Sequence, residues 1–243
     1  MARNRKTSPS PHRGSAAARR PWRVRLLRGL LKGLGVAVVL VVALVALFGQ
    51  ANPPPGIFML SERQRLGGIE RQWVPMAQIN PHMARAAVAA EDANFCLHWG
   101  FDMHELRRAI DAGGRRGAST ISQQVVKNVF LWHGRSWPRK VLEAALTPLM
   151  EATWSKRRIL EVYLNVAEFD AGVFGVEAAA RHYFGVSAAD LTLTQASRLA
   201  AILPDPKGRD AARPSAFVQR RAAAIADGAA TIARDGRAAC FGG

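Results

Sequence analysis

Cysteine is scarce in this sequence, with two residues in 243, so a small scaffold held together by several disulfides is excluded. Cys96 and Cys240 are far apart, and neither has a second cysteine or a histidine at the spacing of a zinc ligand set. A structural zinc site is therefore not expected. The sequence leaves open whether the two cysteines meet, and a packed thiol is the expected state of Cys96.

Acidic residues are absent from the N-terminal region, and the first one in the chain is Glu62. Residues 1–32 carry ten Lys and Arg, which is most of the formal net charge of +16. Residues 33–243 carry the other 24 against 18 acids, which leaves +6. A basic arm of this kind binds either nucleic acid or a membrane surface. Because it has no series of interleaved aromatics and no reading motif, we expect no nucleic acid partner.

An apolar run of nineteen residues overlaps the end of the arm, from Leu30 to Phe48, with Lys32 as its one charge. At about 1.5 Å rise per residue, a helix of this length nearly spans a hydrocarbon core of about 30 Å. Basic residues before such a span keep the N-terminus in the cytoplasm. We therefore predict a cytoplasmic arm at 1–29 and a membrane helix at 30–48, with the rest of the chain across the membrane.

The alternative for the same run is a cleaved signal peptide, with Gly49-Gln50-Ala51 as a small-x-small cleavage site. We favour the anchor because the run is longer than the apolar region of about 7–15 residues in signal peptides. Pro53-Pro54-Pro55-Gly56 is expected to act as a stiff spacer, so 49–56 is predicted as a linker and 57–243 as one domain. That length leaves no room for a second catalytic domain.

The domain is predicted to be mainly α, because apolar residues recur at helical spacing and no run of alternating strands is present. Helix-start signals stand at Asn80-Pro81 and at Thr120, which fits a capping box with Gln123. Pro138 is predicted to open a helix that Pro148 kinks. The predicted helices are 81–90, 101–112, the one from Thr120 to about 130, the one from 138 onward, 155–166, 172–184, 192–203 and 214–233, and a mobile basic loop is predicted at 113–117.

Glu91 and Asp92 follow the Ala-rich helix and precede Phe95, His98 and Trp99. A carboxylate at a helix end beside aromatics can have its pKa raised by loss of solvent, and can then act as a general base. The alternative is that the two acids are surface charges and His98 is a satisfied core residue. The histidines form no HExxH set, so a metalloprotease is not indicated.

Two further segments combine cations with hydrogen-bonding side chains. Residues 117–128 place hydroxyls, amides and Lys127 at a helix N-terminus, where free N–H groups and the helix dipole favour an anion such as phosphate. Residues 135–143 carry three cations and Glu143, a set that suits a pyrophosphate and its metal ion. The alternative for Arg139 and Glu143 is an ordinary surface pair at i, i+4.

In this order the segments match the motifs of the peptidoglycan glycosyltransferases, and the sequence resembles that family over about residues 57–203. The family's motifs are met as EDxxFxxHxG at 91–100, GxSTIxQQxxKN at 117–128 and RKxxE at 139–143, with looser matches at 156–165 and 172–185. The resemblance implies a lysozyme-like, mainly α glycosyltransferase domain behind one membrane helix. The sequence departs from familiar members at 111–116, where the loop is several residues shorter.

The resemblance also implies an activity and a set of site residues. Members of the family join the disaccharide-pentapeptide units of lipid II into β-1,4-linked glycan strands of the bacterial cell wall, with inversion and release of undecaprenyl diphosphate. Glu91 then corresponds to the general base, and Glu143 to a second essential acid that orients cations or a metal ion. The expected substrate-binding residues are Ser119, Thr120, Gln123, Gln124, Lys127, Asn128, Arg135, Arg139, Lys140 and Asn165.

Cofactor, partners and location follow from the same resemblance. A divalent cation, Mg²⁺ or Mn²⁺, is expected to be held mainly by the substrate's pyrophosphate rather than by a protein ligand set. The expected partners are lipid II, the growing glycan strand, inner-membrane lipid and proteins of the division or elongation machinery. The catalytic domain is expected in the periplasm, anchored in the bacterial inner membrane.

Two alternatives to this function are considered. A lytic muramidase of lysozyme-like fold cuts glycan with paired carboxylates, but it needs no cluster of cations such as the one between 127 and 140. A non-catalytic scaffold would bind anionic lipid through the arm at 1–32. A transpeptidase is not expected, because no S-x-x-K, S-D-N or K-T-G set occurs.

Overall fold

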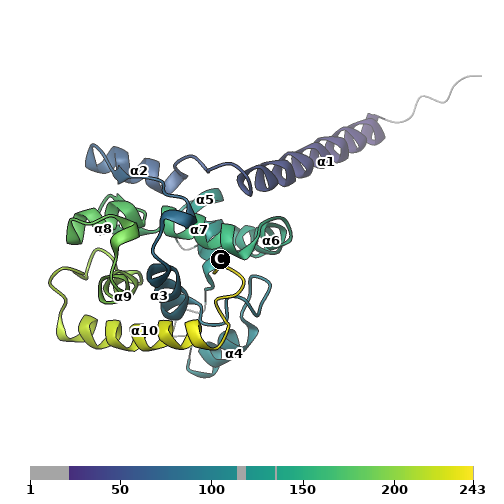
Figure 1. Ribbon diagram of the computed structural model, residues 1–243. Helices are drawn as coiled ribbons and strands as arrows, with labels where there is room; N and C mark the ends of the chain where they lie inside the picture. The colour runs from purple at the N-terminus through teal and green to yellow at the C-terminus, as the bar shows by residue number, and fades with distance from the viewer. Residues whose placement is uncertain (1–21, 114–118, 135, 243) are drawn as a thin grey trace, which may run out of the picture. The chain divides into compact units, whose positions relative to one another are not determined.

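The structure is a computed structural model that describes residues 22–113, 119–134 and 136–242 (Figure 1). The chain divides into two compact units, Met1–Val41 and Val42–Gly243. The predicted basic loop at 113–117 and the first 21 residues of the predicted arm therefore lie almost entirely outside the described residues.

Helix α1 (Trp22–Phe48) forms the described part of the first unit and the start of the second. Among the described residues it is the one helix long and apolar enough to cross a membrane. It begins eight residues before the predicted span, so Arg23, Arg25 and Arg28 of the predicted arm are helical as well. Straight-chain and apolar residues with no proline allow the helix to continue through the arginines.

The second unit is built mainly from helices, as the sequence predicted. Its helices are α2 (Ile57–Leu66), α3 (Pro81–Glu91), α4 (Met103–Asp111), α5 (Ile121–Phe130), α6 (Trp137–Thr153), α7 (Lys156–Val166), α8 (Val176–Phe184), α9 (Leu193–Ile202) and α10 (Ala216–Arg234), with short 3₁₀ turns at Met76–Gln78 and Ala188–Asp190.

Side-chain caps explain most of the helix starts. The predicted capping box is present, since Thr120 accepts from the Gln123 backbone while the Gln123 side chain accepts from Thr120 N. Helix α4 begins at Met103 rather than at the predicted 101, because the Asp102 carboxylate accepts from two backbone N–H groups of the first turn. Helix α6 contains Pro148, which the sequence predicted to kink it.

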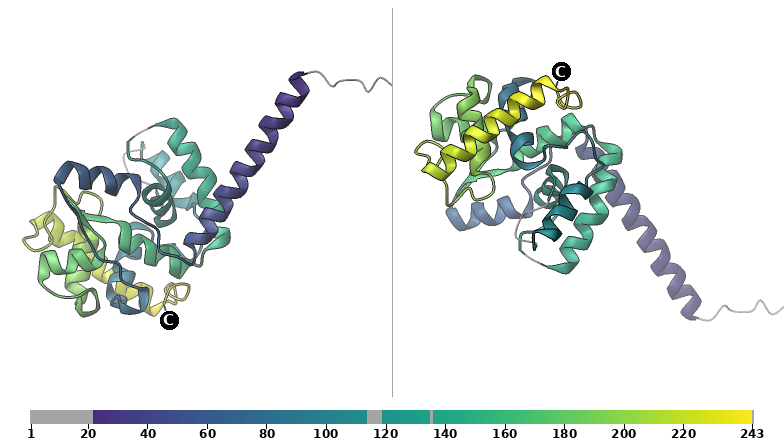
Figure 2. Two further views of the ribbon diagram at one scale, coloured as in Figure 1. Left: turned by 90° about the horizontal axis from the view of Figure 1, so that it is seen from above. Right: turned by 90° about the horizontal axis from the view of Figure 1, so that it is seen from below.

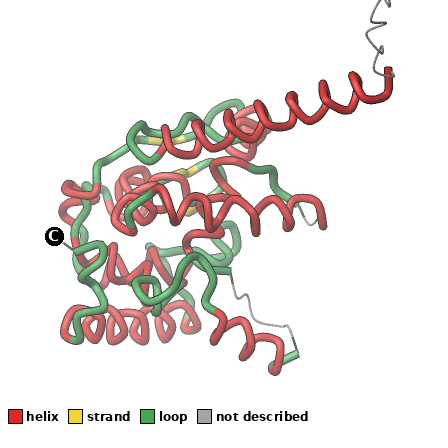
Figure 3. The backbone as a smooth tube through the Cα atoms, turned by 90° about the vertical axis from the view of Figure 1, so that its right-hand side faces the viewer, coloured by secondary structure: helices red, strands yellow, loops and turns green. Residues whose placement is uncertain are grey.

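Three short strands differ from the sequence prediction, which found none. β1 (Glu70–Arg71) pairs in parallel with β3 (Val173–Phe174), and β3 pairs antiparallel with β2 (Glu168–Asp170), as the yellow segments in Figure 3 show. The helix predicted over 172–184 therefore starts only at Val176. Gly172 and Gly175 adopt φ of 79° and 87°, which L side chains avoid, and strands of two or three residues carry no readable periodicity.

The core of the domain surrounds α7, which is buried along nearly its whole length. Helix α5 packs against α6 and α7, while α3, α9 and α10 pack against one another, with α10 in yellow along one side (Figure 2). Small residues allow the close approach of α3 and α10, because a Cβ added at Gly228 would lie 3.2 Å from the Cβ of Ala89. The end of α3 thereby comes to lie beside α10.

The predicted linker at 49–56 is not a free spacer. Pro53 and Gly56 are buried, and the Pro53 carbonyl accepts a hydrogen bond from Arg71 at 3.1 Å. This segment lies within the second compact unit, Val42–Gly243. The prolines favour an extended chain, as expected, but that chain lies against the domain.

The expectation that Cys96 is a packed thiol is wrong. Cys96 and Cys240 form a disulfide with a Cα–Cα distance of 5.7 Å, closed across 144 residues. The rings of Phe95 and Phe241 lie 6.2 Å apart beside it, and Arg237 donates to the Ala93 carbonyl at 3.2 Å. The segment after α10 therefore packs on the loop after α3, a long-range contact that no local pattern predicts.

Candidate active site

Glu91 is the last residue of α3, and its side chain is largely buried, with 13% exposed. Its Oε2 accepts a hydrogen bond from Gln124 Nε2 at 2.9 Å, and Arg221 Nη2 lies 3.9 Å from Oε1. Burial raises the pKa of Glu91, while the Gln124 hydrogen bond and the charges of Arg221 and Lys127 act in the opposite direction. The carboxylate is therefore a stronger base than an exposed glutamate.

Asp92 fixes the end of α3 to the start of α5. One carboxylate oxygen accepts from the backbone N–H of Ile121 at 3.0 Å, and the other lies 2.8 Å from His98 Nε2. Asp92 is 7% exposed, so it is not a surface charge. The His98 side chain is largely buried, as in the alternative interpretation, but its Nδ1 has no hydrogen-bond partner among the described residues. The hydrogen bond between Asp92 and Ile121 therefore holds Glu91, at the end of α3, near the site residues on α5.

Helix α5 carries two kinds of site residue. Thr120 is buried, and its hydroxyl is used by the helix cap and by the Gly100 carbonyl at 2.6 Å. Thr120 is therefore part of the frame of α5, and its predicted role in substrate binding stays a prediction. Gln123 points toward α6 and donates to Glu143 Oε1 at 3.2 Å, while Gln124 reaches Glu91.

Glu143 on α6 is the centre of a buried cluster of charges. It is 3% exposed, and it lies 3.0 Å from Arg139 Nη1 and 2.5 Å from Lys140 Nζ. The alternative of an ordinary surface pair for Arg139 and Glu143 is therefore wrong. Because Arg139, Lys140 and Gln123 all donate to this carboxylate, both of its oxygens are occupied.

Lys127 links the two acids electrostatically. Burial lowers its pKa, the charges of Glu143 and Glu91 raise it, and those of Arg139 and Lys140 lower it further. Charges from the ends of α3 and α6 therefore both act on Lys127 of α5, so these separate sequence segments lie near one another.

Lys127 also lines a cavity of about 410 Å³. The other described residues that line it include Gln124, Asn128, His133, Tyr163 and Lys207. Burial, together with the neighbouring cations Lys127, Arg139 and Lys207, lowers the pKa of His133 to about 4. His133 is thus neutral at pH 7, so the cations of the cavity are the two lysines, and Glu168 and Asp205 line it as well.

A second cavity, of about 290 Å³, has a different lining. Glu91 lines it together with acidic and small polar residues, which are Asp92, Asn94, Asp102, Glu105, Ser119 and Thr120. Ser119 therefore lies on this side of Glu91, away from the cations. Glu91 lines the acidic cavity, and its partner Gln124 lines the other one, where Lys127 and Lys207 stand beside Glu168 and Asp205.

The predicted site residues that the structure describes and that line neither cavity are Gln123, Arg139, Lys140, Glu143 and Asn165. Asn165 is fully buried, where its amide bonds both backbone groups of Val74 and the Glu161 carbonyl, each at 2.8 Å. These hydrogen bonds give Asn165 a place in the framework, and its predicted role in supporting the pocket stays a prediction. Arg135 lies outside the described residues.

The structure also adds residues that the sequence did not single out. Arg221 on α10 approaches Glu91 from a position 130 residues further along the chain, and Lys207 follows α9. Both lie outside the motifs. Lys207 forms ion pairs with Glu62 at 3.1 Å and Glu168 at 3.2 Å. No local pattern marks these two residues, because only the fold brings them to the site.

Among the described residues, one cluster has the composition of a metal site. Potential ligand atoms of Asp92, His98 and Asp102 lie within 4.8 Å of one another. The two aspartates, however, already accept backbone N–H groups at the starts of α5 and α4. These hydrogen bonds fit a structural role for the two aspartates and leave few of their oxygen lone pairs for a metal ion.

Comparison with known proteins identifies the family. A family model described as Transglycosylase matches residues 60–230. The chain is 62% identical over 240 residues to a biosynthetic peptidoglycan transglycosylase of Jannaschia sp. (strain CCS1), which covers 99% of this chain and 98% of the relative. Proteins of the same name from Rhodospirillum centenum and Caulobacter vibrioides are 49% and 46% identical, each over 89% of this chain and 96% of the relative. The chain therefore belongs to the transglycosylase family, as the motifs indicated, and is a peptidoglycan glycosyltransferase of cell-wall synthesis.

Proposed function

We propose that Glu91 is the general base in the polymerisation of lipid II into glycan strands. It removes the proton from the 4-hydroxyl of the acceptor sugar, and that oxygen attacks the anomeric carbon of the donor. The new β-1,4 bond forms with inversion as the bond to undecaprenyl diphosphate breaks. The observation that carries this assignment is a largely buried carboxylate of raised pKa, hydrogen-bonded to Gln124, which lines the same cavity as Lys127.

The leaving diphosphate is stabilised by cations rather than by a general acid. Lys127, Arg139 and Lys140 are the described candidates, and Arg135 joins them by the resemblance of its motif. Fixed charges in a water-poor site stabilise developing negative charge strongly. Because Lys127 lines the 410 Å³ cavity, we assign that cavity to the diphosphate end of the donor and the acidic cavity to sugar hydroxyls.

Glu143 organises these cations. Both of its oxygens are engaged by Arg139, Lys140 and Gln123, so it is not free to act as a nucleophile. Its negative charge allows three cations to gather around one space without strong mutual repulsion. A diphosphate that enters would then exchange places with part of this pairing.

A divalent cation, Mg²⁺ or Mn²⁺, fits this site only through the substrate. The carboxylate of Glu143 is saturated, and those of Asp92 and Asp102 cap helices, so the described residues supply no free set of oxygen ligands. When bound, the ion would be held by diphosphate oxygens and would neutralise part of their charge.

We place the catalytic domain in the periplasm, anchored by α1 in the inner membrane. The basic residues lie before the span, which favours a cytoplasmic N-terminus. The Cys96–Cys240 disulfide is independent support, because such bonds persist in oxidising compartments. Division or elongation proteins are the partners that this location suggests.

Purified full-length protein in detergent, incubated with lipid II and Mg²⁺, Mn²⁺ or a chelator, tests the proposal. Polymeric glycan on a gel, with loss of product in the chelator, is the expected result. A parallel incubation with finished sacculi serves as the control for hydrolysis. Release of soluble fragments from sacculi without polymer from lipid II would instead indicate a muramidase and would overturn the proposal.

A further inference from the structure

The C-terminal end of α1 is built into the catalytic domain. Its last seven residues, Val42–Phe48, belong to the domain unit. Val45 is the one residue of α1 that is buried, at 1% exposure. Leu44 and Leu47 beside it stay exposed. The domain thus holds one face of the helix end and leaves the other faces free for lipid.

The domain also completes the hydrogen bonding of this helix end. The last four carbonyls of an α-helix have no partner within the helix. The Val45 carbonyl accepts from Trp154 Nε1 at 2.7 Å, and the Phe48 carbonyl accepts from Arg158 Nε and Nη2 at 3.2 and 3.1 Å. Backbone N–H groups of the following turn satisfy the two carbonyls between them. Arg158 also places a cation where the helix dipole favours one.

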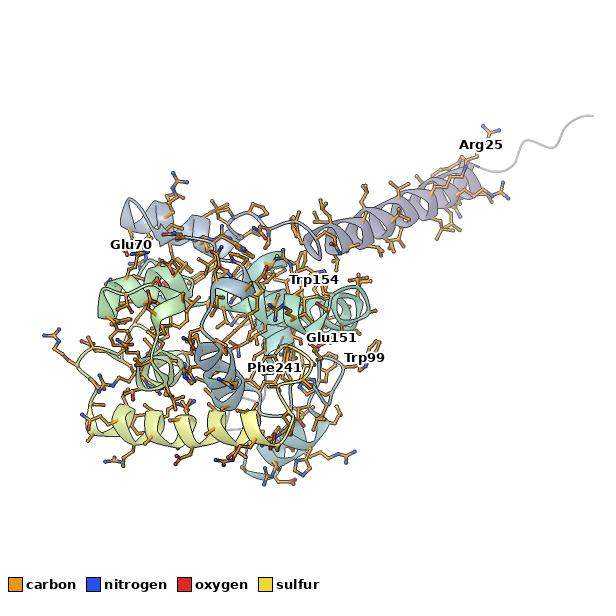
Figure 4. The ribbon with its side chains drawn as sticks, viewed as in Figure 1. Arg25, Glu70, Trp99, Glu151, Trp154 and Phe241 are labelled. Atoms are coloured by element: carbon orange, nitrogen blue, oxygen red, sulfur yellow. A yellow bond between two sulfur atoms is a disulfide. The ribbon has the colours of Figure 1, made fainter. Side chains whose placement is uncertain are left out.

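Trp154 and Arg158 are themselves held in place. Trp154 is buried and lies next to the end of α1 (Figure 4). A Cβ added at Gly49 would lie 2.9 Å from its Cδ1, so the turn after the helix fits closely against the indole. Arg158 forms an ion pair with Glu161 and donates to the Ala51 carbonyl at 2.6 Å. The junction is therefore a packed and fully bonded connection.

The same junction reaches the helix that carries site residues. Phe130, the last residue of α5, has its ring 5.9 Å from that of Phe48 and 6.3 Å from that of Trp154. Further along, a Cβ added at Gly56 would lie 2.2 Å from the Asn128 carbonyl oxygen. The chain that leaves α1 therefore packs against α5 at two points, within one turn of Lys127.

We propose that Trp154 and Arg158 are positioning residues that lock the membrane anchor to the catalytic domain and hold the active site at a fixed distance from the bilayer. The proposal rests on the proposed function, in which the reacting diphosphate belongs to a lipid. The apolar run of α1 ends at Phe48, and Trp154 holds it one turn before that end. Trp154 therefore holds the end of the apolar run that leads into the domain.

A fixed distance matters because the diphosphate of a membrane lipid is confined to the bilayer surface. A domain on a flexible tether would visit many heights and orientations, of which few would meet the substrate. Holding the site and the substrate in one geometry avoids these unproductive orientations. A displacement of about 1 Å can lower the rate about 10²-fold. The advantage disappears for a substrate that diffuses freely in solution.

The test uses the full-length protein and two substrates. Trp154→Phe keeps the aromatic packing but removes the N–H donor, and Arg158→Met keeps the stem but removes the charge. The double variant is compared with Arg157→Met, a neighbour whose side chain binds the Phe241 carbonyl instead of α1. Gly49→Ala is a second, independent disruption. Each is assayed on undecaprenyl lipid II in liposomes and on a soluble short-chain lipid II analogue in detergent.

We expect the double variant and Gly49→Ala to lose about tenfold or more in rate on the liposome substrate, and less than about twofold on the soluble analogue. Hydrogen exchange of the amides of Gly49, Gln50 and Ala51 should quicken in both, and stay unchanged in Arg157→Met. Equal losses on both substrates, or unchanged exchange, would overturn the proposal. Wild-type protein that polymerises neither substrate would refute the proposed function, and the exchange result would still decide the junction.

Discussion

The two buried glutamates of the site, Glu91 and Glu143, have opposite surroundings. Glu91 accepts one hydrogen bond from a neutral amide, and its nearest cation lies 3.9 Å away. Glu143 is paired with Arg139 and Lys140 at 3.0 and 2.5 Å. A carboxylate left short of partners is available to take a proton, whereas one saturated by cations holds those cations in place. The difference in surroundings assigns different roles to the same residue type.

The largest expected effect is on the rate when Glu91 is replaced. Glu91→Gln should reduce the initial rate of lipid II polymerisation by about 10²- to 10⁴-fold, because the proton acceptor is lost. Binding of lipid II should remain, since the amide keeps the shape of the side chain. Glu70→Gln, an exposed glutamate on β1, is the matched control. A loss below about tenfold would remove Glu91 from the role of base.

Replacing Glu91 and replacing Glu143 should change the stability of the folded protein in opposite directions. The raised pKa of Glu91 means that its ionised form is penalised in the folded protein above the unfolded value of 4.5. Glu91→Gln should therefore raise the thermal midpoint at pH 7. The gain should vanish at a pH well below 4.5, where Glu91 is protonated in both states. A midpoint lowered at pH 7 would contradict this account.

Glu143→Gln should combine a loss of rate with a loss of stability. The variant leaves Arg139 and Lys140 without their shared carboxylate, so the leaving group is less well stabilised and the rate should fall about 10²- to 10³-fold. Loss of a charged hydrogen bond should lower the free energy of unfolding by about 1.5–3 kcal/mol. Lys140 is half-exposed, so the decrease in the free energy of unfolding should lie near the lower end of this range. Kinetics and denaturant unfolding of the same preparation measure both.

The sequence predicted the parts of the site whose residues are close together along the chain, and it did not predict contacts between residues far apart. Gln123 with Thr120, and Arg139 with Glu143, are neighbours on one helix, so their spacing was enough to place them together. The core position of Asn165 was not predictable, because its partner Val74 lies 91 residues away. Arg221 and the disulfide likewise depend on how the C-terminal part of the chain packs against the loop after Glu91.

For the fold, too, local features were predictable from the sequence and long-range contacts were not. Helix positions followed from caps and apolar spacing, with boundaries off by one to four residues where Asp102 and Gly175 override the pattern. The strands β1 and β3 were missed, because each has two residues and they pair across about a hundred positions. The role of 49–56 was also missed, since composition predicts an extended chain but not the surface it covers.

Opening the disulfide should loosen the Glu91 end of the site and leave the Glu143 end unchanged. Cys96→Ser with Cys240→Ser should lower the free energy of unfolding by about 2–4 kcal/mol, because the unfolded chain regains the freedom of a 144-residue loop. Hydrogen exchange should quicken over residues 92–100 but not over α6. Wild-type protein in a reductant is the matched comparison. Equal loosening of both regions would contradict the division.

The smallest expected effect concerns Arg221. Removing its charge in Arg221→Gln should raise the pKa of Glu91 further, so the acid limb of the rate profile should move to higher pH. The rate well above that limb should change less than about threefold, because the base itself remains. Arg220→Gln, on an exposed face of α10, is the control. An acid limb that stays in place would show that Arg221 does not act on the base.

The disulfide also has a consequence for the order in which the protein matures. Cys240 is made 144 residues after Cys96, so during N-to-C synthesis the first thiol stays unpaired while most of the domain follows it. Until Cys240 has been made, the loop after Glu91 lacks the C-terminal segment that packs on it. The site is therefore completed only after Cys240 has been made. A chain halted before Cys240 carries an unpaired thiol.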